Sequence, residues 1–193
     1  MRRMLMLSAV TLCLGTSWAS AQEPPKGGAP PRSSQNAPAT ELSLPQLKMS
    51  GQIYVGELAP DFALTSSAGR EVTLSRLRGE WVLLHFVPDR RDFAALQEAQ
   101  PELADMGVTL VGVCKDNPQS LRSYVQREGV SYELLADATG EISAVYGLYD
   151  AAASASRSGF LVVDRNGKVR LALMGTIPPR QLVELVRYTM SGF

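Results

Sequence analysis

Two continuous apolar runs constrain the fold of this chain more than any other feature. Trp81 to Val87 (WVLLHFV) is apolar apart from one histidine, and Val108 to Val113 (VTLVGV) is a second run of this kind. Short apolar runs without polar alternation are typical of strands buried on both faces of a sheet. The stretch between them, Phe93 to Asp105, has helical spacing, and Pro101 is placed to bend or divide that helix. The core is therefore expected to begin with a strand, a helix and a second strand.

The other expected elements continue this alternation. They are a hairpin at residues 61–64 and 71–74, helices at 118–128 and 142–146, a hairpin at 160–163 and 169–173 around an Asn-Gly turn, and an amphipathic helix at 178–190. Alternating strands and helices followed by an antiparallel pair predict an α/β fold, in which helices cover both faces of a mixed central sheet. Residues 51–193 have the length of a single domain with one core.

The first 21 residues are typical of a secretory signal. Arg2 and Arg3 form a basic start, an apolar stretch follows, and small residues at Ala19 and Ala21 suit a signal peptidase that cleaves before Gln22. The apolar stretch is about 11 residues long, which is too short for a permanent membrane span. We therefore expect an exported protein, periplasmic or secreted, with no membrane-spanning segment.

An alternative makes Cys13 a lipid-bearing cysteine, but Leu12 before it is larger than such a site usually allows. Residues 22–50 are rich in Pro, Gly, Ser and Ala and carry little apolar material. Such a composition cannot offset the entropy lost on folding, so it predicts a disordered linker between the signal and the domain.

Charge and cysteine content limit the possible functions. The 19 basic and 19 acidic residues balance and form no basic stripe, so nothing indicates binding to nucleic acid. Cys13 belongs to the signal, which leaves Cys114 as the single thiol of the mature chain. One thiol cannot form an internal disulfide. A two-cysteine redox cycle would need a second protein, a second copy of the chain or a small thiol.

Six segments in the same order resemble the peroxiredoxin family, the alkyl hydroperoxide reductases and thiol-specific antioxidant proteins. They are residues 56–62 (GELAPDF), 77–82 (LRGEWV), 111–116 (VGVCKD), 134–137 (LLAD), 146–148 (YGL) and 157–164 (RSGFLVVD). The resemblance implies a thioredoxin-like fold with an N-terminal β-hairpin extension. It also implies an antioxidant or oxidoreductase role.

The resemblance further implies a site after the first buried strand, where the family has Pro-x-x-x-Thr-x-x-Cys and then a Glu. Placing Pro88 on the Pro puts Asp92 on the Thr, Ala95 on the peroxidatic cysteine and Glu98 on the Glu. Arg157 matches the family's arginine that contacts thiolate and peroxide, although a plain surface arginine is an equal alternative. Ala95 offers no nucleophile, so we expect a degenerate site. We also expect Asp92 to cap the helix and to pair with Arg157.

Two further residues remain as candidates. Cys114 follows the second apolar run, at the sheet edge where α/β folds place their sites. The alternative is that Cys114 is a small buried apolar residue of the core. The one histidine, His85, is expected to be a hydrogen-bonded core residue or a partly exposed one. No metal-ligand spacing, phosphate loop or Ser-His-Asp arrangement is visible, so we expect no metal and no cofactor.

Three hypotheses of function follow. The chain is a non-peroxidatic binding or accessory module, a one-cysteine oxidoreductase that uses Cys114 and is recycled by a small thiol or another protein, or a structural protein of an assembly. The missing cysteine favours the first. The partner and the oligomeric state stay open.

Overall fold

The computed structural model describes residues 53–150 and 152–192, so the expected signal and linker lie outside the described residues. Its strands are β1 (Ala63–Ser66), β2 (Glu71–Thr73), β3 (Trp81–Val87), β4 (Val108–Cys114), β5 (Glu133–Ala136), β6 (Tyr149–Asp150), β7 (Ala155–Ser156), β8 (Gly159–Val163) and β9 (Val169–Met174). Its α-helices are α1 (Gln100–Asp105), α2 (Pro118–Glu128), α3 (Glu141–Val145) and α4 (Pro179–Ser191), and its 3-10 helices are η1 (Leu74–Leu77) and η2 (Arg90–Leu96).

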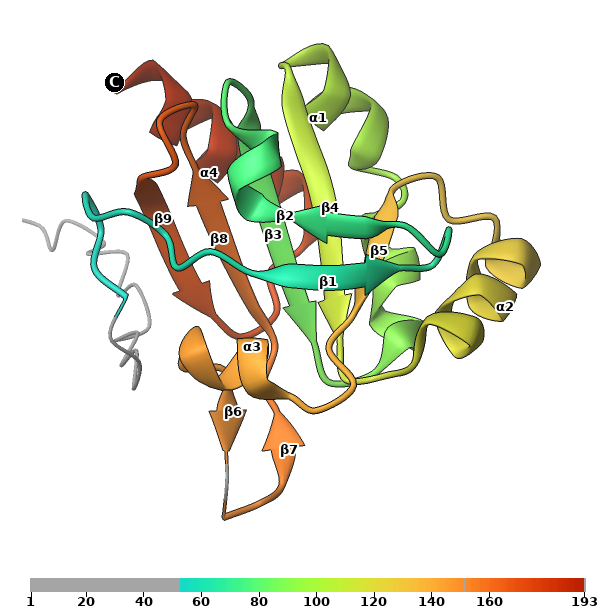
Figure 1. The fold of residues 1–193 in the computed structure, drawn as a ribbon. Coiled ribbons are helices and arrows are strands. Elements are labelled where there is room, and N and C mark those ends of the chain that lie inside the picture. The colour runs from blue at the N-terminus through green and yellow to red at the C-terminus, as the bar shows by residue number, and fades with distance from the viewer. Residues whose placement is uncertain (1–52, 151, 193) are drawn as a thin grey trace, which may run out of the picture. The chain divides into compact units, whose positions relative to one another are not determined.

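A seven-stranded mixed sheet in the order β2-β1-β5-β4-β3-β8-β9 forms the centre of the domain (Figure 1). β3, β4 and β5 are parallel, whereas β8 runs antiparallel to β3 and β9 antiparallel to β8. The N-terminal hairpin joins this sheet because β1 pairs with β5, Thr65 opposite Ala136. The expected α/β fold of the thioredoxin type, with its hairpin extension, is confirmed.

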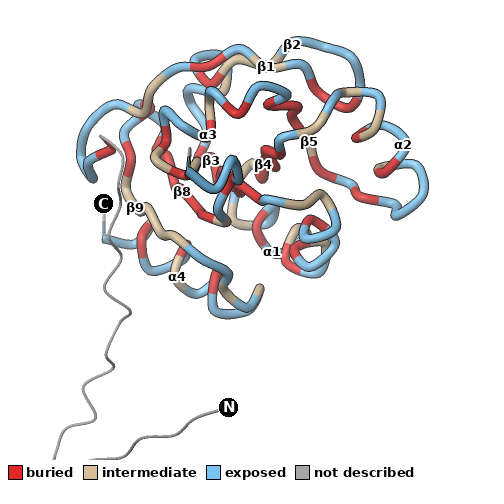
Figure 2. Tube along the Cα trace, turned by 90° about the horizontal axis from the view of Figure 1, so that it is seen from below, coloured by how far each residue is buried: buried red, intermediate tan, exposed pale blue. Residues whose placement is uncertain are grey.

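The central strand β3 serves two apolar cores because its side chains alternate between the faces of the sheet. Trp81, Leu83 and Val87 pack on one face, and Val82, Leu84 and Phe86 on the other. Buried residues accordingly follow β3, β4 and β8 in Figure 2. The first core is the larger one and contacts η2, α1, α2 and α4, while α3 and η1 contribute to the second.

Some boundaries differ from expectation. The helix expected over Phe93 to Asp105 is divided into η2 and α1, and Pro101 stands in the first turn of α1, where proline is tolerated. The first hairpin begins two residues later than expected. The short hairpin of β6 and β7 was not anticipated, because two-residue strands leave no periodic signal. Within the described ranges, none of the helices is long and apolar enough to span a bilayer.

Candidate functional site

The chain leaves β3 at Pro88 and begins η2 with a cap that differs from the expected one. Asp89 is the N-cap: its Oδ1 accepts from Arg91 N at 2.9 Å, and its Oδ2 accepts from Arg91 Nη2 at 2.6 Å. These hydrogen bonds lower the pKa of Asp89 to about 2. The expected cap, Asp92, therefore lies within the first turn of η2, and it is exposed.

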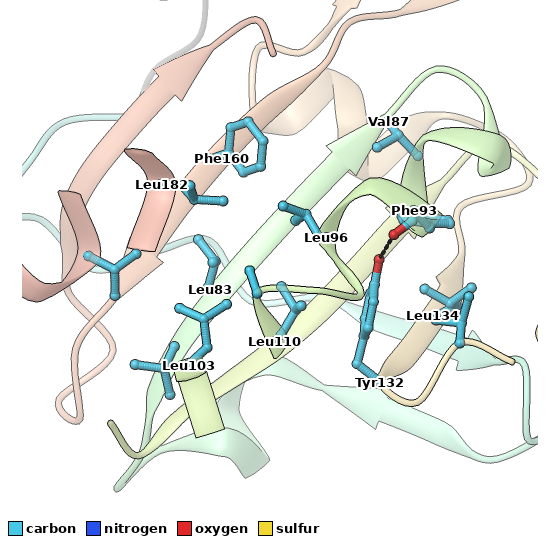
Figure 3. Packing of buried hydrophobic residues seen from close by; sticks show 14 of the residues in the cluster. Leu83, Val87, Phe93, Leu96, Leu103, Leu110, Tyr132, Leu134, Phe160 and Leu182 are labelled. Carbon is cyan, nitrogen blue, oxygen red and sulfur yellow. Dashed lines mark hydrogen bonds between the residues drawn. The ribbon is translucent and has the colours of Figure 1, made fainter. Parts of the chain in front are cut away.

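Buried contacts fix the position of η2. Phe93 and Leu96 are buried in the larger core, and Tyr132 Oη donates to the carbonyl of Phe93 at 2.7 Å (Figure 3). Gly112 on β4 makes room for the Phe93 ring, because a Cβ at this glycine would lie 2.5 Å from Phe93 Cε1. Ala95 and Glu98 are exposed beside these anchors. The expected location of the site is thus an ordered, solvent-facing helix without a nucleophile.

Arg157 pairs with a different carboxylate from the one expected. Its Nη2 donates to Asp150 Oδ2 at 2.5 Å, which links the end of β6 to the residue after β7. Backbone hydrogen bonds, first from Ala153, and the Arg157 guanidinium together lower the pKa of Asp150. The expected pair of Arg157 with Asp92 is wrong, because the unanticipated β6–β7 hairpin supplies Asp150 as the partner of Arg157.

Cys114 is a core residue at the end of β4. It is 1% exposed and packs among the apolar residues of the larger core. Burial, with smaller contributions from the carboxylates of Asp116 and Asp89, raises the pKa of its thiol to about 12. Because the thiolate is the nucleophilic form, this environment suppresses thiol chemistry.

His85 lies in the same core, between two aromatic rings. It stacks on Phe160 with ring centroids 4.5 Å apart and meets Phe93 edge to face at 5.9 Å. Its burial is as expected, but its Nδ1 has no hydrogen-bond partner. Burial lowers the pKa of His85 to about 3, so the ring is neutral at pH 7. Among the described residues, no three His, Cys, Asp or Glu side chains form a metal-binding group.

A charged pocket that was not expected from the sequence lies at the carboxyl ends of β3 and β4. This open pocket has a volume of about 450 Å³. We call it the basic pocket, and it is lined by Pro88, Asp89, Arg90, Arg91, Cys114, Lys115, Asp116 and Arg127. A signal was present in the sequence, since two buried runs are each followed at once by clustered charges, PDRR and KD. Parallel strands bring such clusters to the same sheet edge. The described lining of the basic pocket includes Pro88 but neither Ala95 nor Arg157.

Comparisons with known proteins identify the family of this chain. The family model described as the AhpC/TSA family matches residues 55–172. The chain belongs to the AhpC/TSA family. A peroxiredoxin of Thermoplasma volcanium is 31% identical over 130 residues, which cover 61% of this chain and 64% of that protein. The thiol-disulfide oxidoreductase ResA of Geobacillus thermodenitrificans is 28% identical over 131 residues, or 65% of this chain and 72% of the relative.

Solved structures of peroxiredoxins share the fold. Peroxidoxin BcpB of Mycobacterium tuberculosis superposes with a TM-score of 0.65 at 20% identity, covering 73% of this chain and 98% of that one. The 2-Cys peroxiredoxin of Plasmodium vivax superposes with a TM-score of 0.65 at 24% identity, covering 72% of this chain and 98% of that one. Within the matched AhpC/TSA range of this chain, Cys114 is the one cysteine.

Proposed function

We propose that this AhpC/TSA protein is non-peroxidatic and acts as a binding or accessory module. One observation carries the proposal: no cysteine occurs from residue 14 to residue 113, so η2 and the loop before it carry no thiol. The residue that the resemblance places on the peroxidatic position is Ala95, and Arg157 is engaged by Asp150. A peroxidase of this fold needs a thiolate that attacks the O–O bond and becomes a sulfenic acid.

The second candidate is a one-cysteine oxidoreductase that uses Cys114. In its favour, Cys114 lines the basic pocket, and one relative is named a thiol-disulfide oxidoreductase. Against it stand the burial of Cys114 and the raised pKa of its thiol. The physical balance therefore favours the binding module.

Peroxide turnover separates the two candidates. Consumption of hydrogen peroxide would be followed with an excess of dithiothreitol, using the chain with Cys13→Ser and the same chain with Cys114→Ala added. The binding module predicts that neither protein consumes peroxide above the dithiothreitol background. Turnover that the Cys114→Ala change abolishes would establish the oxidoreductase instead.

We also propose that the chain is exported and that residues 22–50 tether the domain. The basic start and the small residues before Gln22 support export. The test is the intact mass of the protein from the periplasmic fraction of a Gram-negative host. A mass that begins at Gln22 is expected, whereas uncleaved protein retained in the cytosol would contradict export.

A further inference from the structure

We infer that the basic pocket binds a small anion through its carboxylate or phosphate oxygens. The inference rests on the proposed function as a binding module, and it names the class of ligand that the module takes. Its charges, its volume and its place in the fold each support this assignment.

The charge of the basic pocket favours an anionic ligand. Four cationic side chains, Arg90, Arg91, Lys115 and Arg127, line the pocket with two carboxylates, Asp89 and Asp116. Glu128 pairs with Arg127 from outside this lining, so the group as a whole carries one positive charge in excess. Like charges gathered at one concave surface repel each other and are stabilised by a bound counter-charge. A bound anion would neutralise this excess.

The arginines keep hydrogen-bond donors for a ligand even though each has an acidic neighbour. Arg90 contacts Asp116 through Nη1, and Arg127 contacts Glu128 through Nε. A guanidinium carries five N–H donors in a planar fork that matches carboxylate and phosphate oxygens. Exposed ion pairs contribute little stability, so rearranging the exposed Arg91 or Arg127 toward a ligand costs little.

Lys115 is held in place at the pocket rim. Its Nζ lies 3.2 Å from Tyr149 Oη and 4.9 Å from the centre of the Tyr149 ring. This ring also packs beside Gly140, where an added Cβ would lie 3.2 Å from Tyr149 Cε2. The ammonium group is therefore partly ordered before a ligand arrives, which lowers the entropy lost on binding.

Position and size indicate a small ligand. The pocket lies beyond the carboxyl ends of the parallel strands β3 and β4, the usual binding edge of an open α/β sheet. Its volume of about 450 Å³ is in the range of small-molecule sites. A folded protein partner would instead need a broad, flat contact surface.

The test is a titration of the full-length, ¹⁵N-labelled protein with succinate and, separately, with inorganic phosphate at constant ionic strength. Succinate tests for a ligand with carboxylate groups, and inorganic phosphate tests for a ligand with a phosphate group. We expect saturable shifts for one or both probes, centred on the backbone amides of Asp89, Arg90, Lys115 and Asp116. Sodium chloride at the same ionic strength is expected to produce no saturable shift.

Arg91→Gln with Arg127→Gln removes two exposed cations of the pocket and leaves the Arg90–Asp116 pair intact, so the fold is preserved. We expect about tenfold weaker binding in this double variant. Arg180→Gln, an exposed arginine on α4, is the matched control and should bind as the parent does. Absence of saturable binding, shifts centred elsewhere, or equal binding by the double variant would each overturn the inference. None of these results alters the peroxide assay, so the two proposals fail separately.

Discussion

Arg157 donates to Asp150 across the ends of the β6–β7 hairpin, with Nη2 and Oδ2 2.5 Å apart. The arginine that the family resemblance assigns to peroxide contact is thereby engaged by an acid that the sequence pattern did not suggest. The pair is half exposed, so it contributes little to stability, but it sets where the guanidinium points.

A cysteine introduced into η2 should therefore keep an ordinary thiol pKa. We expect Ala95→Cys, made with Cys13→Ser and Cys114→Ala, to be alkylated with a midpoint near the ordinary thiol pKa of about 8.5, because the site is exposed and Arg157 is engaged. The measurement is the pH dependence of the iodoacetamide rate. Adding Asp92→Thr removes a nearby negative charge, and adding Asp150→Asn releases Arg157; each should lower the midpoint. A midpoint below about 7 in the variant without either addition would show a preserved activating site.

Gly112→Ala should destabilise the domain because its methyl group would lie 2.5 Å from Phe93 Cε1 and 2.7 Å from Leu134 Cδ2. Overpacking of this kind costs about 1–3 kcal/mol of unfolding free energy. Urea denaturation followed by circular dichroism measures it. Gly192→Ala, with no contact under 3.7 Å, is the control. An unchanged midpoint for Gly112→Ala would mean that Phe93 does not pack over β4.

Tyr132→Phe tests how η2 is anchored. Removing the hydroxyl leaves the buried carbonyl of Phe93 without this donor, which should cost about 1–3 kcal/mol. Tyr188→Phe is the matched control because Tyr188 is 79% exposed. Faster amide hydrogen exchange over residues 90–96 in Tyr132→Phe alone is expected. Equal effects of the two changes would mean that the hydrogen bond from Tyr132 to Phe93 does not anchor η2.

His85 should make the domain sensitive to mild acid. Its pKa is lowered to about 3 in the folded chain, so the unfolded chain, with a histidine pKa near 6.5, binds a proton more readily. As far as His85 is concerned, the unfolding free energy is at its full value above about pH 6.5 and falls as the pH drops from about 6.5 toward 3. Between pH 7.5 and 5 the loss should be about 2 kcal/mol.

Urea denaturation at these two pH values, with His85→Phe as the comparison, isolates this effect. The chain has one histidine, and the lowered carboxyl pKa values of Asp89 and Asp150 act only at lower pH. The variant should lose this part of the pH dependence. An identical change in unfolding free energy between the two pH values in both proteins would contradict a neutral, buried His85.

The fold was predictable because its signals are local and strong. The β3 run and the α2 helix, with its Asn117 cap and Pro118, match their expected bounds. The site was less predictable, since side-chain pairing depends on elements distant in sequence. Two-residue strands decided the partner of Arg157. Asp89 rather than Asp92 is the cap because η2 begins at Arg90, three residues before the expected start at Phe93. The basic pocket arises only where two strand ends meet.

The reactivity of Cys114 in the folded and unfolded chain tests the central claim most directly. With Cys13→Ser, Cys114 is the single thiol, and its rate of reaction with hydrogen peroxide can be measured in buffer and in concentrated urea at the same pH. Burial and the raised pKa predict a slower reaction in the folded protein than in the unfolded one. A faster reaction in the folded protein would show an activated thiol and would contradict a non-peroxidatic role.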